Sequence, residues 1–180
     1  MRILHIGKFY PPFHGGMENF LAALIESQVS SGHEVAALVH AHTPTGLSFP
    51  PYSSDVLPWI IRAPCYGRLL YAPISPAFPF WLARTLRDFC PDILHFHLPN
   101  TSAFWALASS RSWKVPWVIH WHSDVVASKI DHRLKLAYRF YRPFEQAMLK
   151  RANAIVVTSP PYLESSLALR DWRAKCHVVP

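Results

Sequence analysis

Short apolar runs alternate with longer amphipathic stretches along the whole chain. The runs that predict buried strands are 2–7, 34–39, 56–62, 92–97, 115–121, 154–158 and 176–179. The stretches whose apolar residues follow helical spacing are 17–31, 75–90, 101–111, 128–151 and 162–169. Strands that alternate with helices form βαβ units, whose parallel strands are joined by right-handed crossovers. The pattern therefore predicts an α/β fold with a single, Rossmann-like, doubly wound parallel sheet.

Two segments depart from this regular pattern. Residues 42–55 are rich in proline, serine, threonine and glycine and predict a loop. The long helix at 128–151 contains Pro143, which is expected to kink it or split it in two. Its predicted apolar stripe consists of Leu134, Ala137, Tyr141, Phe144 and Met148.

The loop at 8–16 follows the first strand and ends in Gly15 and Gly16, which open the first helix. In doubly wound sheets, ligands bind at the carboxyl ends of the strands. The glycine pair tolerates positive φ and leaves room for a ligand, and a helix N-terminus presents unpaired N–H groups. These features predict a phosphate or diphosphate site, although a tight turn that needs glycine remains an alternative. The G-x-G-x-x-G fingerprint and the acidic residue of nicotinamide sites are absent from this part of the sequence.

Paired histidines lie on two strands that we expect to be neighbours. His95 and His97 are two residues apart, as are His120 and His122, so each pair points to one face of the sheet. The cluster could hold a metal, or its members could be core residues bonded to backbone carbonyls. His122 differs from the others because it lies where its strand ends, where an imidazole can act as a general base or bind a sugar hydroxyl.

Composition limits the remaining possibilities. The net charge of +7 favours anionic partners, and the 51% of hydrophobic residues indicate a globular chain. The three cysteines form no C-x-x-C pair and cannot all pair with one another, so we expect no disulfide framework and a cytoplasmic location. No nucleic-acid-binding motif is found, and nucleic acid is not an expected partner.

The predicted helix at 129–151 carries basic residues that lie off its apolar stripe. They are Lys129, Arg133, Lys135, Arg139, Arg142, Lys150 and Arg151. Such a helix can present a solvated face, or it can bind an anionic membrane surface. In the second case the protein would lie peripherally on the inner face of the membrane.

The ordered set of motifs resembles the N-terminal domain of GT-B-fold glycosyltransferases, specifically the large retaining group called family four. The resemblance covers residues 1–180. It rests on Phe9-Tyr10-Pro11-Pro12-x-x-Gly15-Gly16-x-Glu18, Gly32-His33-Glu34-Val35, Asp92-Ile93-Leu94-His95-x-His97, Trp121-His122-Ser123-Asp124 and Arg151-Ala152-Asn153-Ala154-Ile155-Val156-Val157-Thr158-Ser159.

This resemblance implies that a sugar is transferred with retention from a nucleotide diphosphate sugar to a glycan or lipid-linked acceptor, without a bound metal or other cofactor. It implies that Gly15 and Gly16 approach the donor diphosphate and that His122 contacts the donor sugar near the reacting centre. The residues that it suggests for the acceptor site or its rim are Glu18, Asn19, Asn100, Ser123 and Asp124.

The second, donor-binding domain of the GT-B fold would follow Pro180. The 180-residue chain alone is therefore expected to be inactive and to need a C-terminal GT-B domain in cis or in trans. Two further hypotheses stay open. The chain could be a non-catalytic module or partner subunit that binds a nucleotide or sugar phosphate, or it could be a metal-dependent hydrolase that uses the paired histidines.

Overall fold

The computed structural model describes residues 1–42, 58–125 and 132–179. The strands are β1 (Arg2–Ile6), β2 (Glu34–His40), β3 (Trp59–Ala63), β4 (Arg68–Leu69), β5 (Ala72–Pro73), β6 (Ile93–Leu98), β7 (Trp117–Trp121), β8 (Ala154–Val157) and β9 (Cys176–Val178). The α-helices are α1 (Gly16–Ser30), α2 (Phe78–Phe89), α3 (His132–Arg151) and α4 (Pro160–Ser165). The 3₁₀-helices are η1 (Thr101–Ala108), η2 (Ser112–Lys114) and η3 (Arg170–Lys175).

Within the described residues, seven strands form one sheet in the order β3-β2-β1-β6-β7-β8-β9, and every pair of neighbours is parallel. The chain fills one half of the sheet from β1 outward to β3 and then crosses back to continue at β6. The predicted doubly wound α/β fold is confirmed. The order reverses between β1 and β6, so the crevice at their carboxyl ends is where this topology places ligands.

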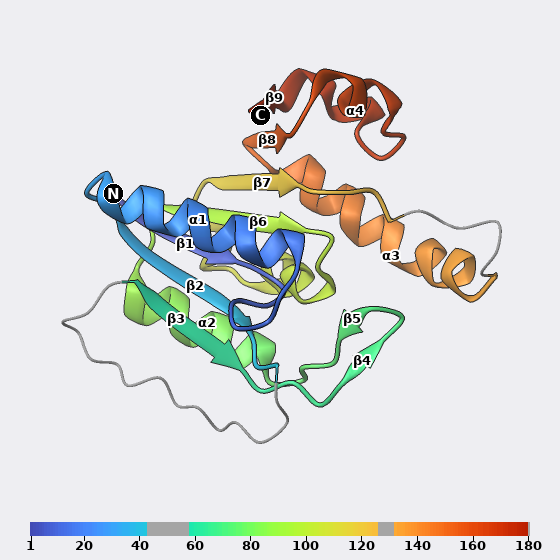
Figure 1. Cartoon of the computed structure of the whole chain (residues 1–180). Coiled ribbons are helices and arrows are strands. Elements are labelled where there is room, and N and C mark those ends of the chain that lie inside the picture. The colour runs from blue at the N-terminus through green and yellow to red at the C-terminus, as the bar shows by residue number, and fades with distance from the viewer. Residues whose placement is uncertain (43–57, 126–131, 180) are drawn as a thin grey trace.

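Different helices cover the two faces of the sheet. Leu4, Leu94 and Ile119 belong to the large apolar core beneath α2, while Leu21 and Ile25 of α1 pack on the opposite face. Figure 1 shows α1 crossing that opposite face over β1 and β6. Since side chains alternate along a strand, the strands that bury leucine and phenylalanine under α2 turn their other residues toward α1.

Several elements differ from the sequence predictions. Helix α3 continues through Pro143, so it is not split in two, and the alternative of a kink stays a prediction. The short antiparallel hairpin β4–β5 was not predicted, because strands of two residues leave no periodic pattern. Its turn places Leu70 and Tyr71 at positive φ, which neither residue type signals. The predicted loop at 43–55 and residues 128–131 of the predicted helix lie outside the described residues.

The surface of α3 also differs from the predicted stripe. Met148 is buried as expected, but Phe144 is 52% exposed, and Leu136 and Phe140 are 61% and 70% exposed. Arg151 leaves the basic face, because its guanidinium donates to the carbonyls of Trp113 and Val115. Among the described residues, no helix is long and apolar enough to cross a membrane.

Candidate active site

Three segments meet at the carboxyl edge of the sheet beside the reversal in strand order. They are the loop between β1 and α1, the segment from Pro99 to Thr101 after β6, and the segment that begins with His122 after β7. The register pairs Leu98 with Trp121, so β6 and β7 end side by side. Most of the residues predicted for the site therefore come together at one edge.

Gly15 and Gly16 stand at the start of α1 in ordinary backbone conformations. Gly15 is extended at φ −173°, and neither glycine has positive φ, so the predicted conformational reason for this pair is wrong. A Cβ on Gly16 would meet nothing within 4 Å, whereas one on Gly15 would clash with the carboxylate of Glu18. Gly16 thus leaves open space beside the unpaired N–H groups of the first helical turn.

Buried polar side chains hold the first loop in place. The Asn100 side chain donates to the Gly7 carbonyl at 2.9 Å and accepts from the Ser102 amide at 3.1 Å. His40 bonds to the Lys8 carbonyl through Nδ1 and to the Ser102 hydroxyl through Nε2. Since the carbonyl can only accept, Nδ1 of His40 carries the proton and the hydroxyl donates to Nε2.

Asn100 is only 2% exposed, so both ends of its amide serve to position the loop. His40 and Ser102 are site residues that the sequence prediction missed. The available signal was a histidine at the carboxyl end of a strand that is otherwise apolar.

His122 is half-buried, stacks on the ring of His120 and meets the ring of Phe20 edge-on. Its ring lies 4.4 Å from the ring of His120 and 5.2 Å from that of Phe20, one turn along α1 from Gly16. Burial, with a smaller effect from His120, lowers the pKa of His122 to about 3. The imidazole is therefore neutral at physiological pH and too weak a base to remove a proton efficiently, but it can orient a hydroxyl group.

Asp124 is tied into the fold beyond β7. Its Oδ1 atom accepts hydrogen bonds from Trp121 Nε1 at 2.8 Å, the Tyr162 hydroxyl at 2.9 Å and the Ser166 hydroxyl at 2.7 Å. These bonds fasten the end of β7 to α4. Ser123 is exposed.

Glu18 and Asn19, in the first turn of α1, differ in their burial. Glu18 is buried, and its carboxylate folds back toward Gly15, whereas Asn19 is exposed. Burial lowers the pKa of Lys8, and the charge of Glu18 acts in the opposite direction. The carboxylate of Glu18, which lies against Gly15, thus interacts with the cation of Lys8 in the loop. The acceptor or rim roles suggested for Glu18 and Asn19 stay predictions.

The histidines form a larger cluster than the sequence predicted, because His5 of β1 joins the four histidines on β6, on β7 and directly after β7. Possible ligand atoms of His5, His95 and His97 lie within 4.8 Å of one another. Both ring nitrogens of His5 and both of His97 are, however, engaged in hydrogen bonds. A metal bound here would have to displace those bonds, so the geometry favours a hydrogen-bonded network over a metal centre.

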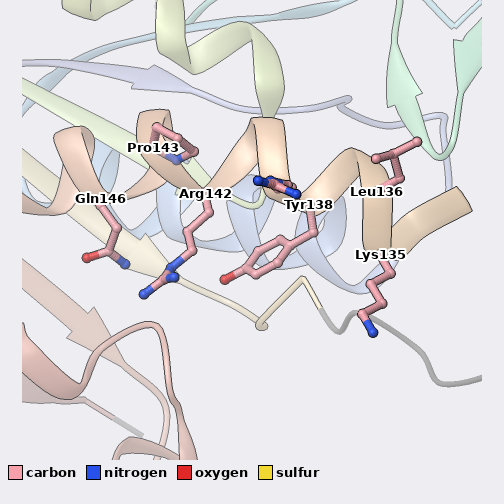
Figure 2. Close-up of a pocket in the computed structure, with 7 residues that line it drawn as sticks. Lys135, Leu136, Tyr138, Arg142, Pro143 and Gln146 are labelled. Carbon is pink, nitrogen blue, oxygen red and sulfur yellow. The ribbon is translucent and has the colours of Figure 1, made fainter. Parts of the chain in front are cut away.

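Several cavities border α3. One of about 490 Å³ adjoins the first loop and is mainly apolar and aromatic. The residues that line it include Lys8, Tyr71, Asn100, Phe104, Tyr138 and Tyr141. A second of about 760 Å³ lies where Tyr138, Arg142 and Gln146 project from one side of α3 (Figure 2). The first cavity opens beside the candidate active site, while the second is basic.

A family model described as "Glycosyl transferase 4-like domain" matches residues 15–180. The chain belongs to the glycosyl transferase 4-like family. Two curated relatives align with almost the whole chain. The O-antigen chain mannosyltransferase C of Escherichia coli is 28% identical over 183 residues, which are 100% of this chain and 45% of the relative. The D-rhamnosyltransferase WbpZ of Pseudomonas aeruginosa is 27% identical over 186 residues, 99% of this chain and 44% of the relative.

The chain thus spans a little less than half the length of these glycosyltransferases. Among solved structures, sucrose-phosphate synthase from Thermosynechococcus elongatus superposes with a TM-score of 0.68 at 20% identity, over 99% of this chain and 47% of that one. A glycosyltransferase from Rickettsia africae ESF-5 superposes with a TM-score of 0.57 at 16% identity, over 99% of this chain and 42% of that one. These likenesses confirm the Rossmann-like half of a GT-B fold in this glycosyl transferase 4-like chain.

Proposed function

We propose that the chain is the acceptor-side half of a retaining glycosyltransferase. The donor is a nucleotide diphosphate sugar, and the acceptor is a glycan or a lipid-linked sugar. The observation that carries the proposal is the open space at Gly16, at the N-terminus of α1 and one turn from the Phe20 ring that contacts His122. Related mannosyl- and rhamnosyltransferases support the same reaction class.

The geometry suggests how each part would act. As the bond to the anomeric carbon breaks, negative charge develops on the departing diphosphate, and the N–H groups and positive dipole end of α1 stabilise it. His122 orients a sugar hydroxyl beside the reacting carbon. The cations that complete the diphosphate site would come from a second domain, in cis or in trans, because the relatives are about twice as long as this chain.

The aromatic cavity beside the first loop is the proposed acceptor pocket. Tyr71, Phe104 and Tyr138 present rings that can pack on the apolar faces of sugars or on a lipid. Lys8 and Asn100 are among the residues that line this pocket, so an acceptor bound there would reach the same edge of the sheet as the donor.

Replacement of Gly16 by alanine should impair donor binding without impairing folding. The new methyl group meets no atom of the described residues within 4 Å, and alanine is favourable in a helix, so stability should be unchanged or rise by up to about 1 kcal/mol. The methyl would occupy the space proposed for the diphosphate, and the KM for the donor should rise at least tenfold in a protein that carries this chain and the donor domain. Thermal unfolding and steady-state transfer kinetics measure the two effects.

The matched control is Gly32→Ala at the other end of α1. Gly32 has φ +80°, so alanine there should cost about 1–2 kcal/mol of stability without changing the donor KM. A normal donor KM in Gly16→Ala would remove the glycine pair from the donor site. A non-catalytic binding module is the second candidate, and donor turnover by the complete protein would exclude it.

We also propose that α3 attaches the protein to the anionic inner face of a membrane. Leu136, Phe140 and Phe144 recur every four residues, so their exposed side chains form one apolar stripe. Exposed Lys135 and Arg139 lie beside it. This combination is typical of helices that lie in a membrane interface.

The double variant Leu136→Ser/Phe140→Ser should reduce binding to vesicles that contain anionic lipid at least tenfold, because two side chains no longer enter the interface. Co-sedimentation with anionic and with neutral vesicles measures it. Leu167→Ser is the control, since Leu167 is 82% exposed outside α3. Equal loss in the control, or equal binding to neutral vesicles, would contradict the proposed surface.

A further inference from the structure

A continuous line of hydrogen bonds runs from the body of α1 to the candidate active site. Gln28 Oε1 lies 2.7 Å from His5 Nε2, His5 Nδ1 lies 3.0 Å from His97 Nε2, and His97 Nδ1 lies 3.0 Å from His122 Nε2. Gln28, His5 and His97 come from α1, β1 and β6, and His122 directly follows β7. The line therefore crosses three neighbouring strands beneath one helix.

The side-chain oxygen of Gln28, at the end of the line away from the candidate active site, determines the direction of every hydrogen bond. An amide oxygen can only accept, so His5 must carry its proton on Nε2. A neutral imidazole has one protonated nitrogen, so His5 Nδ1 accepts from Nε2–H of His97. By the same rule, His97 Nδ1 accepts from Nε2–H of His122, and Nδ1 of His122 is left without a proton.

The neutral state that this logic requires follows from burial. His5 and His97 are 0% and 1% exposed, and burial lowers the pKa of both below physiological pH. Gln28 is itself neutral. Within the described residues, no hydrogen-bond partner of His122 Nδ1 is found, so that nitrogen is available to a ligand.

We propose that Gln28, His5 and His97 are positioning residues that fix the tautomer of His122, so that its bare Nδ1 accepts a hydrogen bond from a sugar hydroxyl. The tautomer stands on the hydrogen bonds alone, and the sugar contact rests on the proposed function. Contacts of the His122 ring with His120 and Phe20 hold the plane of the ring, while the line of hydrogen bonds decides which nitrogen carries the proton. His122 thus acts as an acceptor that selects and orients a hydroxyl group.

The tautomers can be observed directly in the chain without any assay of transfer. Histidine labelled with ¹⁵N gives two-bond ¹H–¹⁵N correlations that distinguish protonated from bare ring nitrogens, and single His→Gln variants assign the signals. At pH 7 the expected result is Nε2–H with bare Nδ1 for His5, His97 and His122. The opposite tautomer at His122, with Nδ1–H, would overturn the proposal.

Variants at Gln28 test whether this residue determines the tautomer of His122. Gln28→Glu keeps an acceptor and should preserve the tautomer, whereas Gln28→Met removes it and should leave His122 with both tautomers populated. Gln146→Met is the matched control on α3, where the glutamine bonds to Ala168 and Trp172, and it should leave the histidine signals unchanged. Amide spectra verify that each variant is folded.

An unchanged His122 tautomer in folded Gln28→Met would overturn the positioning role. Addition of one equivalent of Zn²⁺ separates the network from a metal centre, because the proposed bonds predict no change in the His5 and His97 signals. Stoichiometric shifts of those signals would also overturn the proposal. Each of these results is independent of donor turnover, so failure here and failure of the proposed function are distinguishable.

Discussion

Replacement of His122 by alanine is expected to reduce sugar transfer by at least about 10²- to 10³-fold, the loss typical when one preorganised polar group is removed from a charged transition state. The assay uses a protein that carries this chain and the donor domain. His122 is neutral because burial lowers its pKa to about 3, so the loss comes from misorientation of a hydroxyl group rather than from loss of a base. The expected change is in kcat more than in KM.

The fold should survive this substitution. His122 is half-buried and donates one hydrogen bond, to His97, so its removal should cost about 1 kcal/mol. The control is His177→Ala, which removes an exposed histidine from the edge strand β9 and should leave transfer unchanged. Near-normal turnover by His122→Ala would remove His122 from the site.

The chain is also expected to lose stability as the pH falls below about 6.5 and to unfold in acidic solution. An unfolded histidine has a pKa of about 6.5. Burial lowers the folded pKa to about 4 for His5, His40 and His120 and to about 3 for His122, and it lowers those of His95 and His97 as well. Below pH 6.5 the unfolded state therefore binds more protons, and stability falls with pH.

Each such histidine removes up to about 1.4 kcal/mol per pH unit, so several together outweigh the typical stability of a domain, about 5–15 kcal/mol. Glu145 acts in the opposite direction, because burial raises its pKa to about 7, and one carboxyl group does not offset six imidazoles. Circular dichroism as a function of pH measures the transition.

His95→Leu tests the assignment of this acid sensitivity to the cluster. Nε2 of His95 is buried and has no hydrogen-bond partner in the described part of the chain, so leucine should keep or raise stability at pH 7 and should shift the acid midpoint downward. His14→Leu alters an exposed histidine and should leave the midpoint in place. Equal shifts in both variants would contradict the role of burial.

The main elements of the fold were predictable because apolar runs and helical spacing express burial directly. The alternation of His95 with Phe96 and of His120 with Trp121 even indicated which residues share a face. The hairpin β4–β5 and the continuity of α3 through Pro143 depend on tertiary contacts, which a periodic pattern does not record.

The roles of single polar residues were harder to predict. Gly15 and Gly16 were correctly placed at the helix start, but the reason for glycine is space rather than φ. Asn100 and Asp124 both proved to be engaged by internal partners, which a residue's type and position at a strand end do not reveal. His5 and Gln28 could not be linked to His122 before the sheet order was known.

The most direct test is a titration of the ¹⁵N-labelled chain with nucleotide diphosphate sugars, including donors of mannose and of D-rhamnose, followed by amide chemical shifts. We predict weak binding, in the millimolar range, with shifts confined to the amides near Gly15 and Gly16 and to the segment that begins with His122. Binding should be weak if, as proposed, the cations that complete the diphosphate site come from a second domain. No shift in these segments at millimolar donor, or tight binding centred elsewhere, would contradict a donor site at this edge of the sheet.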